Sequence, residues 1–337
     1  MLDIITQNLL SPVVLFFVLG IIASVFKSDL KFPKGLSETL SIYLLIAIGL
    51  KGGIELSNYS FDTVIQPIIG TLFLGITTPI LTLIILRFTM KMDSANAIGL
   101  AATYGSVSIV TYGAAITFLG NQGTSYESFM NAMVVLMEIP AILVALCVYG
   151  AIKNAKQQPF VLHQKVGIVA TAPSAFVNKE VLKESLFSKS VLLLVGSLSI
   201  GLVVGKDSLP VIQPLFIDLY NSFLLLFLLN MGIMAGERLD LIKEHDFKLV
   251  VFGICVPLIF GVLGILVGSA TGLSLGGVTL MGVLAASASY IAAPAALKTS
   301  VPDANPSIYL GLALGITFPF NLIFGIPILF SIAQWIW

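Results

Sequence analysis

The sequence predicts an all-α polytopic membrane protein whose ten transmembrane helices form a 5+5 inverted repeat. Three observations predict this class: the composition, the long apolar runs and the placement of the basic residues. Of the 337 residues, 57% are hydrophobic and 10% are charged, whereas a soluble domain carries roughly 25% charged residues. The mean hydropathy of +1.04 agrees. A chain with so few polar residues is not expected to be a soluble enzyme, a disordered protein or a nucleic-acid-binding protein.

Ten apolar runs are long enough to be membrane helices, each of which needs about 20 residues. They are too long and too continuously apolar for the alternating strands of a membrane barrel. The predicted spans are residues 9–26, 38–54, 64–86, 95–119, 128–152, 188–204, 214–236, 248–269, 275–297 and 307–335. The expected organisation is therefore a first repeat at 1–152, a linker loop at 153–187 and a second repeat at 188–337.

The basic residues predict the orientation, because cytoplasmic loops of membrane proteins are enriched in Lys and Arg. With both termini outside, 15 of the 17 basic residues fall in cytoplasmic loops. Lys206 alone falls in an outer loop, and Lys51 falls within a span. We therefore expect an inner (plasma) membrane protein with a cytoplasmic 153–187 loop. The inside residues are Lys27, Lys31, Lys34, Arg87, Lys91, Lys153, Lys156, Lys165, Lys179, Lys183, Lys189, Arg238, Lys243, Lys248 and Lys298.

The two halves of the chain resemble each other. The segment 49–53 (GLKGG) aligns with 232–236 (GIMAG) at an offset of 183, and 105–115 aligns with 286–296 at an offset of 181. Each half holds five spans, an odd number, so the second half must enter the membrane from the opposite side. Inverted repeats of this kind are typical of secondary transporters.

The fourth and ninth spans each carry a hydroxyl-rich stretch near the expected bilayer middle. Pro294 lacks an N–H group and is expected to kink or break the ninth helix. Broken helices expose amide groups that bind anions and carbonyls that bind cations. Close helix packing through small residues is the alternative interpretation, but the paired placement favours a binding site. The candidate residues are Gly105, Ser106, Ser108, Thr111, Ser287, Ser289, Tyr290 and Pro294.

Glu138 lies about ten residues into the fifth span, where a carboxylate is costly and marks a functional candidate. It is expected either to bind a cation or to pair with Lys51. A local ion pair between Lys51 and Glu55, four residues apart on one helix, is the alternative for the lysine. No Walker-type phosphate loop occurs, which disfavours ATP-driven pumping, and no catalytic constellation or metal-ligand spacing indicates an enzyme or a cofactor.

Several of these segments resemble the sodium-dependent bicarbonate transporter family, first known from cyanobacteria. In the second half the likeness is carried by 274–278 (SLGGV), 285–289 (AASAS) and 302–307 (PDANPS). In the first half it is carried by 105–108 (GSVS), 125–127 (SYE) and 138–140 (EIP). The likeness spans nearly the whole chain, and residues 274–307 are its most specific part.

The resemblance implies two broken, crossing helices and an architecture similar to the bile-acid/sodium symporters. It also implies bicarbonate held between these helices, sodium near Ser108, Ser289 and Glu138, a homotrimer, and a cytoplasmic regulator related to the PII family. The resulting hypothesis is a secondary active transporter that imports bicarbonate with sodium by alternating access. Two alternatives stay open: a transporter of another small organic anion or carboxylate, and a membrane sensor that binds an anion without transport.

Overall fold

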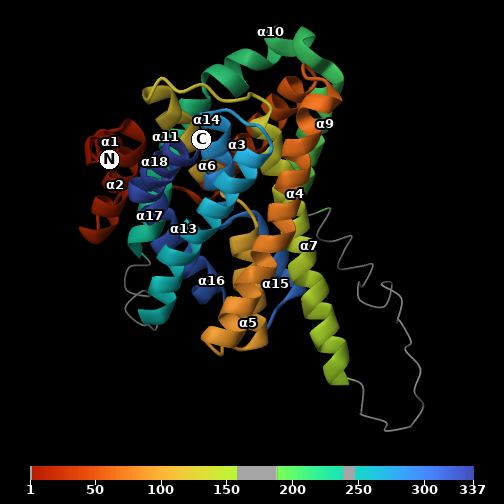
Figure 1. The fold of residues 1–337 in the computed structure, drawn as a ribbon. Coiled ribbons are helices and arrows are strands. Elements are labelled where there is room, and N and C mark those ends of the chain that lie inside the picture. Colours follow the sequence, from red (N-terminus) through yellow and green to blue (C-terminus); the bar gives the residue numbers. More distant parts are fainter. Residues whose placement is uncertain (1, 158–186, 188, 238–246) are drawn as a thin grey trace.

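The computed structural model describes residues 2–157, 187, 189–237 and 247–337, and the elements within these ranges are helices (Figure 1). The first half consists of α1 (Leu2–Leu9), α2 (Pro12–Val25), α3 (Lys34–Leu56), α4 (Phe61–Ile84) with a π-helical turn at Ile85–Thr89, α5 (Ser94–Gly105), α6 (Ile109–Asn121) and α7 (Met130–Gln157). Most of the linker predicted at 153–187 lies outside the described residues.

The second half is also helical. It consists of α9 (Lys189–Val204), η3 (Gly205–Ser208), α10 (Leu209–Ile212), η4 (Gln213–Asp218), α11 (Tyr220–Glu237), α13 (Phe247–Ala270), α14 (Leu275–Ala286), α15 (Ala292–Ser300) and the final run α16 (Pro306–Leu312), η5 (Ala313–Thr317), α17 (Phe318–Phe320), η6 (Asn321–Gly325) and α18 (Ile326–Ile336).

Within the described residues, seven helices or continuous helical runs are long and apolar enough to cross a membrane. They are Gly35–Leu56, Phe61–Thr89, Ser94–Asn121, Met130–Ile152, Leu209–Glu237, Phe247–Ala270 and Pro306–Ile336. The other three predicted spans correspond to shorter or bent helices. The first is the pair α1 and α2, bent by 57°; the sixth is the 16-residue α9; and the ninth is divided into α14 and α15.

Helix starts follow local sequence signals. Ser11 caps α2 by accepting a hydrogen bond from the Val14 N–H group, and a proline follows it at the first helical position. Asp93 caps α5 in the same way by accepting from the Asn96 N–H group at 3.0 Å. Burial acts to raise the pKa of the Asp93 carboxyl, but the hydrogen bonds from Asn96 together with those from the backbone of Ala95 and Asp93 outweigh it and lower that pKa overall.

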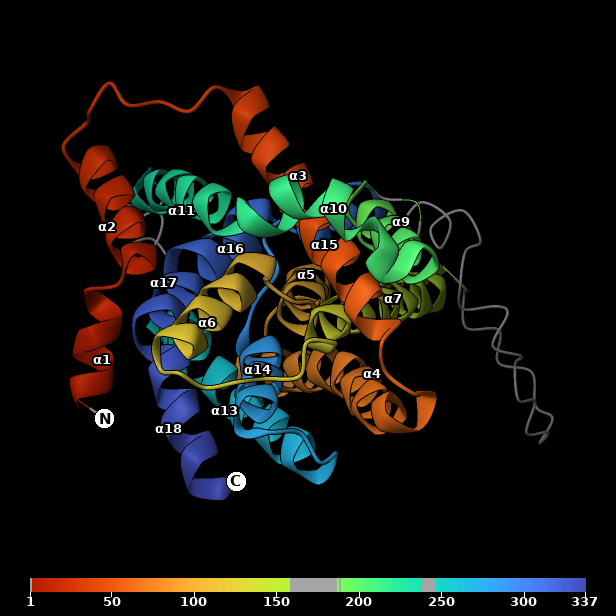
Figure 2. The same cartoon turned by 90° about the horizontal axis from the view of Figure 1, so that it is seen from above.

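Four helices form a layer along one side of the molecule: α2, α3, α9 and α11, hereafter the four-helix layer (Figure 2). Within it α2 packs on α11 and α3 packs on α9. Both pairs approach closely at glycines. A Cβ atom on Gly232 would lie 2.0 Å from the Phe17 carbonyl oxygen, and one on Gly53 would lie 2.1 Å from the Leu198 carbonyl oxygen. These glycines belong to the two segments aligned by the internal repeat.

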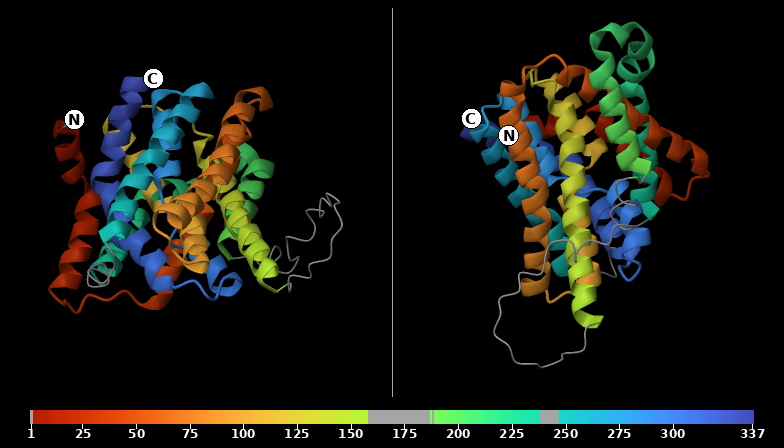
Figure 3. Two further views of the ribbon diagram at one scale, coloured as in Figure 1. Left: turned by 60° about the horizontal axis from the view of Figure 1, so that its bottom comes forward. Right: turned by 90° about the vertical axis from the view of Figure 1, so that its right-hand side faces the viewer.

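The remaining helices form the main bundle beside this layer. The chain termini lie toward one end, and α5 and α15 lie toward the other (Figure 3). Large apolar side chains are exposed on the outward surfaces of the outer helices, among them Leu19 on α2, Phe73 on α4 and Ile259 on α13. Apolar patches of this extent are typical of surfaces that contact lipid.

Candidate functional site

Two helices are interrupted inside the main bundle, at the two hydroxyl-rich stretches. The first interruption separates α5 from α6 at Ser106–Ser108, and the second separates α14 from α15 at Ser287–Ile291. Ser108 begins α6, since its Oγ accepts a hydrogen bond from the Thr111 N–H group at 3.1 Å. Ser289 Oγ similarly accepts from the Ala293 N–H group at 3.2 Å. A serine cap therefore restarts α6, whereas α15 begins after Ile291 without a side-chain cap and Ser289 binds an N–H group of its first turn.

The two breaks lie against each other. The Ser108 N–H group donates to Ser287 Oγ at 2.9 Å, and the Ser289 N–H group donates to the Thr103 carbonyl oxygen at 2.8 Å. Ser106, Ser108, Ser287 and Ser289 are all at most 3% exposed. Residues about 180 positions apart in sequence thus form one buried polar cluster. Inside a membrane, backbone groups without helical partners are tolerated only where protein surrounds them in this way.

The hydroxyl groups of this polar cluster differ in whether their hydrogen is still free to form a hydrogen bond. Ser287 Oγ already donates to the Leu284 carbonyl oxygen, and Thr111 Oγ1 donates to Ser108 Oγ. Ser108 and Ser289 accept hydrogen bonds from N–H groups through the hydroxyl oxygen, which leaves each O–H hydrogen free to donate. These two serine hydroxyls are therefore available as donors to an anion.

A small central cavity adjoins these hydroxyls, with an empty volume of about 220 Å³. Its polar lining consists of Ser108, Ser289, Tyr290 and Glu138. The Tyr290 hydroxyl is buried near Ser108 but forms no hydrogen bond of standard geometry, and the tyrosine ring packs edge-on against Phe318 at 5.3 Å between centroids. Hereafter this space is called the central cavity.

Glu138 projects from α7 into the central cavity and is 1% exposed. Its Oε1 atom accepts a long hydrogen bond from Ser106 Oγ at 3.5 Å, and its Oε2 atom has no hydrogen-bond partner. A buried carboxylate left in this state is strongly destabilising unless a positive charge or a proton joins it. Glu138 Oε2 is therefore the atom of the central cavity that a cation or a proton would stabilise.

One sequence interpretation needs correction. Neither Glu55 nor Glu138 lies within ion-pair distance of Lys51; the ion pair that the described residues do contain joins Lys189 and Glu38. The ninth span is interrupted, as expected, directly before Pro294, which lies in the first turn of α15. The break at Ser287–Ile291 includes Tyr290, four residues before the proline, where a continuous helix would clash with the proline ring.

Gly105 has a packing role at the end of α5. A Cβ atom there would lie 2.7 Å from the ring of Pro79, so the glycine lets α4 and α5 approach. It contributes no side chain to the central cavity.

The last helical run supplies residues that sequence reasoning missed. The Asn321 side-chain amide donates to the Ala286 carbonyl oxygen at 2.7 Å, and the Thr317 and Tyr104 hydroxyls lie 2.6 Å apart. Asn321 thereby satisfies a carbonyl at the end of α14 that has no partner within the helix. Asn321 and Thr317 are isolated polar positions in a long apolar run, which is a weak sequence signal that could have drawn attention to them.

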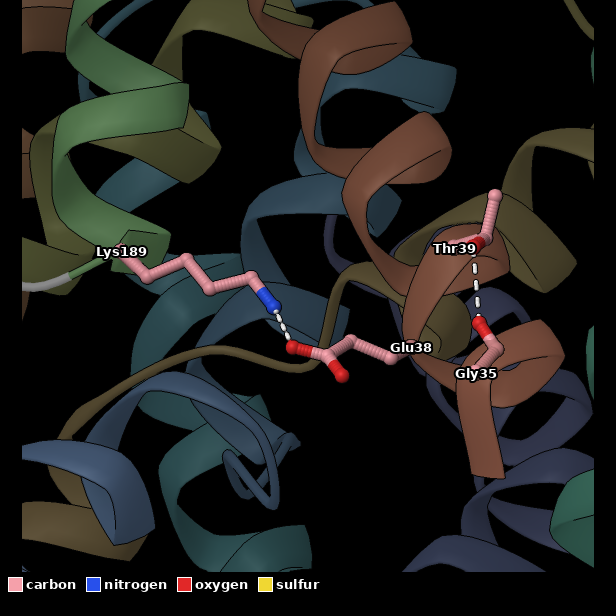
Figure 4. A network of polar contacts seen from close by, with 4 residues as sticks. All are labelled: Gly35, Glu38, Thr39 and Lys189. Carbon is pink, nitrogen blue, oxygen red and sulfur yellow. Dashed lines mark hydrogen bonds and ion pairs between the residues drawn. The ribbon is translucent and has the colours of Figure 1, made fainter.

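A larger cavity lies between the four-helix layer and the main bundle, with an empty volume of about 970 Å³. It shares Leu45, Tyr290 and Ile291 with the central cavity. The Lys189–Glu38 ion pair lines it and connects α9 to α3 (Figure 4). The positive-inside expectation places Lys189 on the cytoplasmic side, so this space is hereafter called the inner cavity.

Comparison with known families gives one result that covers almost the entire chain. Residues 12–334 match the model of the Na+-dependent bicarbonate transporter superfamily. A search of curated proteins finds no significant match. The matched residues include both interrupted helices, Glu138 and the long apolar helices. The family match and these apolar helices together indicate a multi-pass membrane protein. The chain therefore belongs to the Na+-dependent bicarbonate transporter superfamily.

Proposed function

We propose that this protein is a secondary active transporter that imports bicarbonate together with sodium by alternating access. The observation that carries the proposal is the central cavity, where free serine hydroxyls from both repeats meet the unpartnered Glu138 Oε2 atom. A site with anion donors and a buried carboxylate side by side suits an anion and a cation bound together.

The charges of the site explain the coupling. Bicarbonate alone would add a second negative charge beside Glu138, and two like charges in a buried site repel strongly. A sodium ion on Glu138 Oε2 and nearby serine oxygens removes that repulsion and favours anion binding. The hydroxyl groups of Ser108 and Ser289, with the amide groups at the start of α6 and α15, are the proposed donors to the anion.

Membrane energetics also favour the transport of a sodium ion together with bicarbonate. Moving one negative charge inward against a potential of about 100 mV, inside negative, costs about 2.3 kcal/mol. One co-transported sodium ion cancels this electrical cost. The sodium gradient then supplies the driving force for accumulation.

The ten-span, 5+5 architecture belongs to this proposal. It is supported by the pairwise packing of the four-helix layer, in which α2 with α11 is the repeat equivalent of α9 with α3. The two interrupted helices hold equivalent places in their halves. The main bundle and the four-helix layer are then the two bodies whose relative movement opens the central cavity to either side of the inner (plasma) membrane.

Assembly and regulation follow from the family resemblance alone. A homotrimer and a cytoplasmic PII-like regulator that docks on the 153–187 loop complete the proposal. Native mass and cross-linking of the purified protein measure the first, and pull-down with the purified regulator measures the second.

Labelled-bicarbonate uptake into proteoliposomes tests the proposed activity. We expect accumulation with an inward sodium gradient, and little uptake with potassium in place of sodium. Sodium-independent uptake would contradict the coupling, and no bicarbonate uptake under either condition would contradict the substrate.

A second candidate substrate is another small organic carboxylate. The inner cavity favours it, because Phe227, Met231 and Met234 line a space larger than bicarbonate requires. Uptake of labelled acetate or a keto acid, with no bicarbonate uptake, would support this alternative on the same scaffold.

A further inference from the structure

A third cavity lies on the opposite side of the central cavity from the inner cavity. It is enclosed by α3, α6, α7, η4 and the start of α11, and its empty volume is about 430 Å³. Its polar lining consists of Lys51, Asn131, Tyr220 and Asn221, and the other lining residues are alanine and isoleucine. The predicted orientation places this space on the outer side, so it is called the outer cavity.

Lys51 is the charged group of the outer cavity. It is partly exposed, it lies within a predicted span, and no carboxylate lies within 4.0 Å of its ammonium group. Glu55 lies one turn further along α3 without reaching it. An ionisable group inside a membrane span is costly and marks a functional candidate. The cavity therefore offers a positive charge that Glu55 influences electrostatically but does not bind in an ion pair.

The neighbouring polar groups add donors. The Tyr220 hydroxyl is buried and has no hydrogen-bond partner. It lies against Gly113, where a Cβ atom would lie 2.6 Å from the Tyr220 oxygen. Asn131 is held in place, since it accepts from the Tyr112 hydroxyl and donates to the Ser128 carbonyl oxygen. A buried hydroxyl without a partner, lining the same cavity as an ammonium group, is a cost that a bound anion would remove.

We infer that the outer cavity is an anion-binding site, distinct from the central cavity, in which Lys51 and the Tyr220 hydroxyl capture a small carboxylate-like anion before it reaches the serine hydroxyls. The inference rests on the proposed function for the identity of the anion as bicarbonate. The site raises the local concentration of the substrate on the outer side, and the attraction weakens as salt screens the ammonium charge.

Protection of a cysteine at the mouth of the cavity tests occupancy without requiring transport. In a variant whose Cys147 and Cys255 are replaced by alanine, Asn221→Cys is labelled from outside with a neutral maleimide, with and without bicarbonate. We expect bicarbonate to slow labelling severalfold when Lys51 is present, and to have no effect in Lys51→Gln. Labelling that bicarbonate does not slow in the Lys51 protein would overturn the site.

Uptake kinetics provide the second measurement. Lys51→Gln should raise the half-saturating external bicarbonate concentration by about tenfold or more, the scale of one lost hydrogen bond from a charged group, and should abolish its dependence on ionic strength. Lys51→Arg should retain both properties. Lys206→Gln removes an exposed lysine in η3, away from the outer cavity, and should behave as wild type. Equal kinetics for Lys51→Gln and Lys206→Gln would contradict the inference.

The two measurements separate this inference from the proposed function. Protection by bicarbonate without any uptake would support the site and contradict the transport activity. Protection by acetate but not by bicarbonate would support an anion site and contradict bicarbonate as its ligand. Sodium-coupled uptake without protection would support the transport activity and contradict the outer site, leaving the central cavity as the binding site.

Discussion

At the scale of single residues, the Ser289 hydroxyl is expected to donate directly to the transported anion. Ser289→Ala should therefore weaken substrate affinity by roughly ten- to a hundredfold, the scale of one hydrogen bond to a charged group. Binding of labelled bicarbonate to the purified protein measures this. Ser331→Ala is the matched control, because the Ser331 hydroxyl bonds only to the Pro327 carbonyl oxygen within its own helix. Wild-type affinity in Ser289→Ala would place the anion elsewhere.

Tyr290 is expected to shape the central cavity with its ring rather than to bind the anion through its hydroxyl. The ring packs against Phe318, while the hydroxyl is buried without a hydrogen bond. Tyr290→Phe should keep wild-type affinity and unfold at the same or a higher temperature, since it removes an unsatisfied polar group. Tyr290→Ala should lose affinity. A tenfold loss in Tyr290→Phe would instead identify the hydroxyl as a donor.

Glu138 is expected to determine sodium dependence. Glu138→Gln keeps the shape of the side chain and removes the charge that a cation would neutralise. The sodium concentration that gives half-maximal uptake should rise at least about tenfold, with the fold retained, because a buried carboxylate–cation contact is lost. Asp62→Asn, in an exposed position at the start of α4, serves as the control. Unchanged sodium dependence in Glu138→Gln would return this residue to a structural role.

At the scale of helices, glycine contacts hold the four-helix layer together. Gly232→Ala should destabilise the protein by more than about 2 kcal/mol, because the new Cβ atom would lie 2.0 Å from the Phe17 carbonyl oxygen and would force α11 away from α2. Thermal unfolding in detergent measures this change.

Gly196→Ala is the matched control for the layer. No atom lies within 4 Å of a Cβ built on Gly196, so this change should be neutral or stabilise α9 by about 0.5–1 kcal/mol. Equal unfolding temperatures for the two alanine variants would show that the close approach of α2 and α11 does not limit stability.

The positions of the helices and of both breaks were largely predictable, while the contacts between the breaks were not. The hydroxyl-rich stretches predicted to be irregular contain both interruptions, at Ser106–Ser108 and Ser287–Ile291. The second break lies directly before Pro294, in agreement with the expectation, because a proline cannot accept a continuous helix at the residue four positions before it. The bonds that hold the two broken segments together, such as Ser108 N–H to Ser287 Oγ, could not be predicted, because they depend on how the helices pack.

At the scale of the whole molecule, the orientation in the membrane is the main prediction. Asp29→Cys, in the loop between α2 and α3, should react only with membrane-permeant reagents, and Asn121→Cys, at the end of α6, should react with impermeant reagents added outside. Both positions are exposed. The reason is the enrichment of Lys and Arg in the loops on the side of Asp29. The reverse labelling pattern in intact cells would invert the topology and exchange the inner and outer cavities.

The sequence by itself determined that the chain is a multi-pass helical membrane protein and which stretches carry its polar groups. Both follow from local composition, because a helix in contact with lipid must be largely apolar, and a polar residue within an apolar run is therefore easy to identify in the sequence. Only the tertiary structure decided which groups meet. The Ser108–Ser287 bond, the missing partner of Glu138 Oε2 and the absence of an ion pair between Lys51 and Glu138 depend on distances between helices far apart in the chain. Such distances are set by packing of whole helices, which no local pattern encodes.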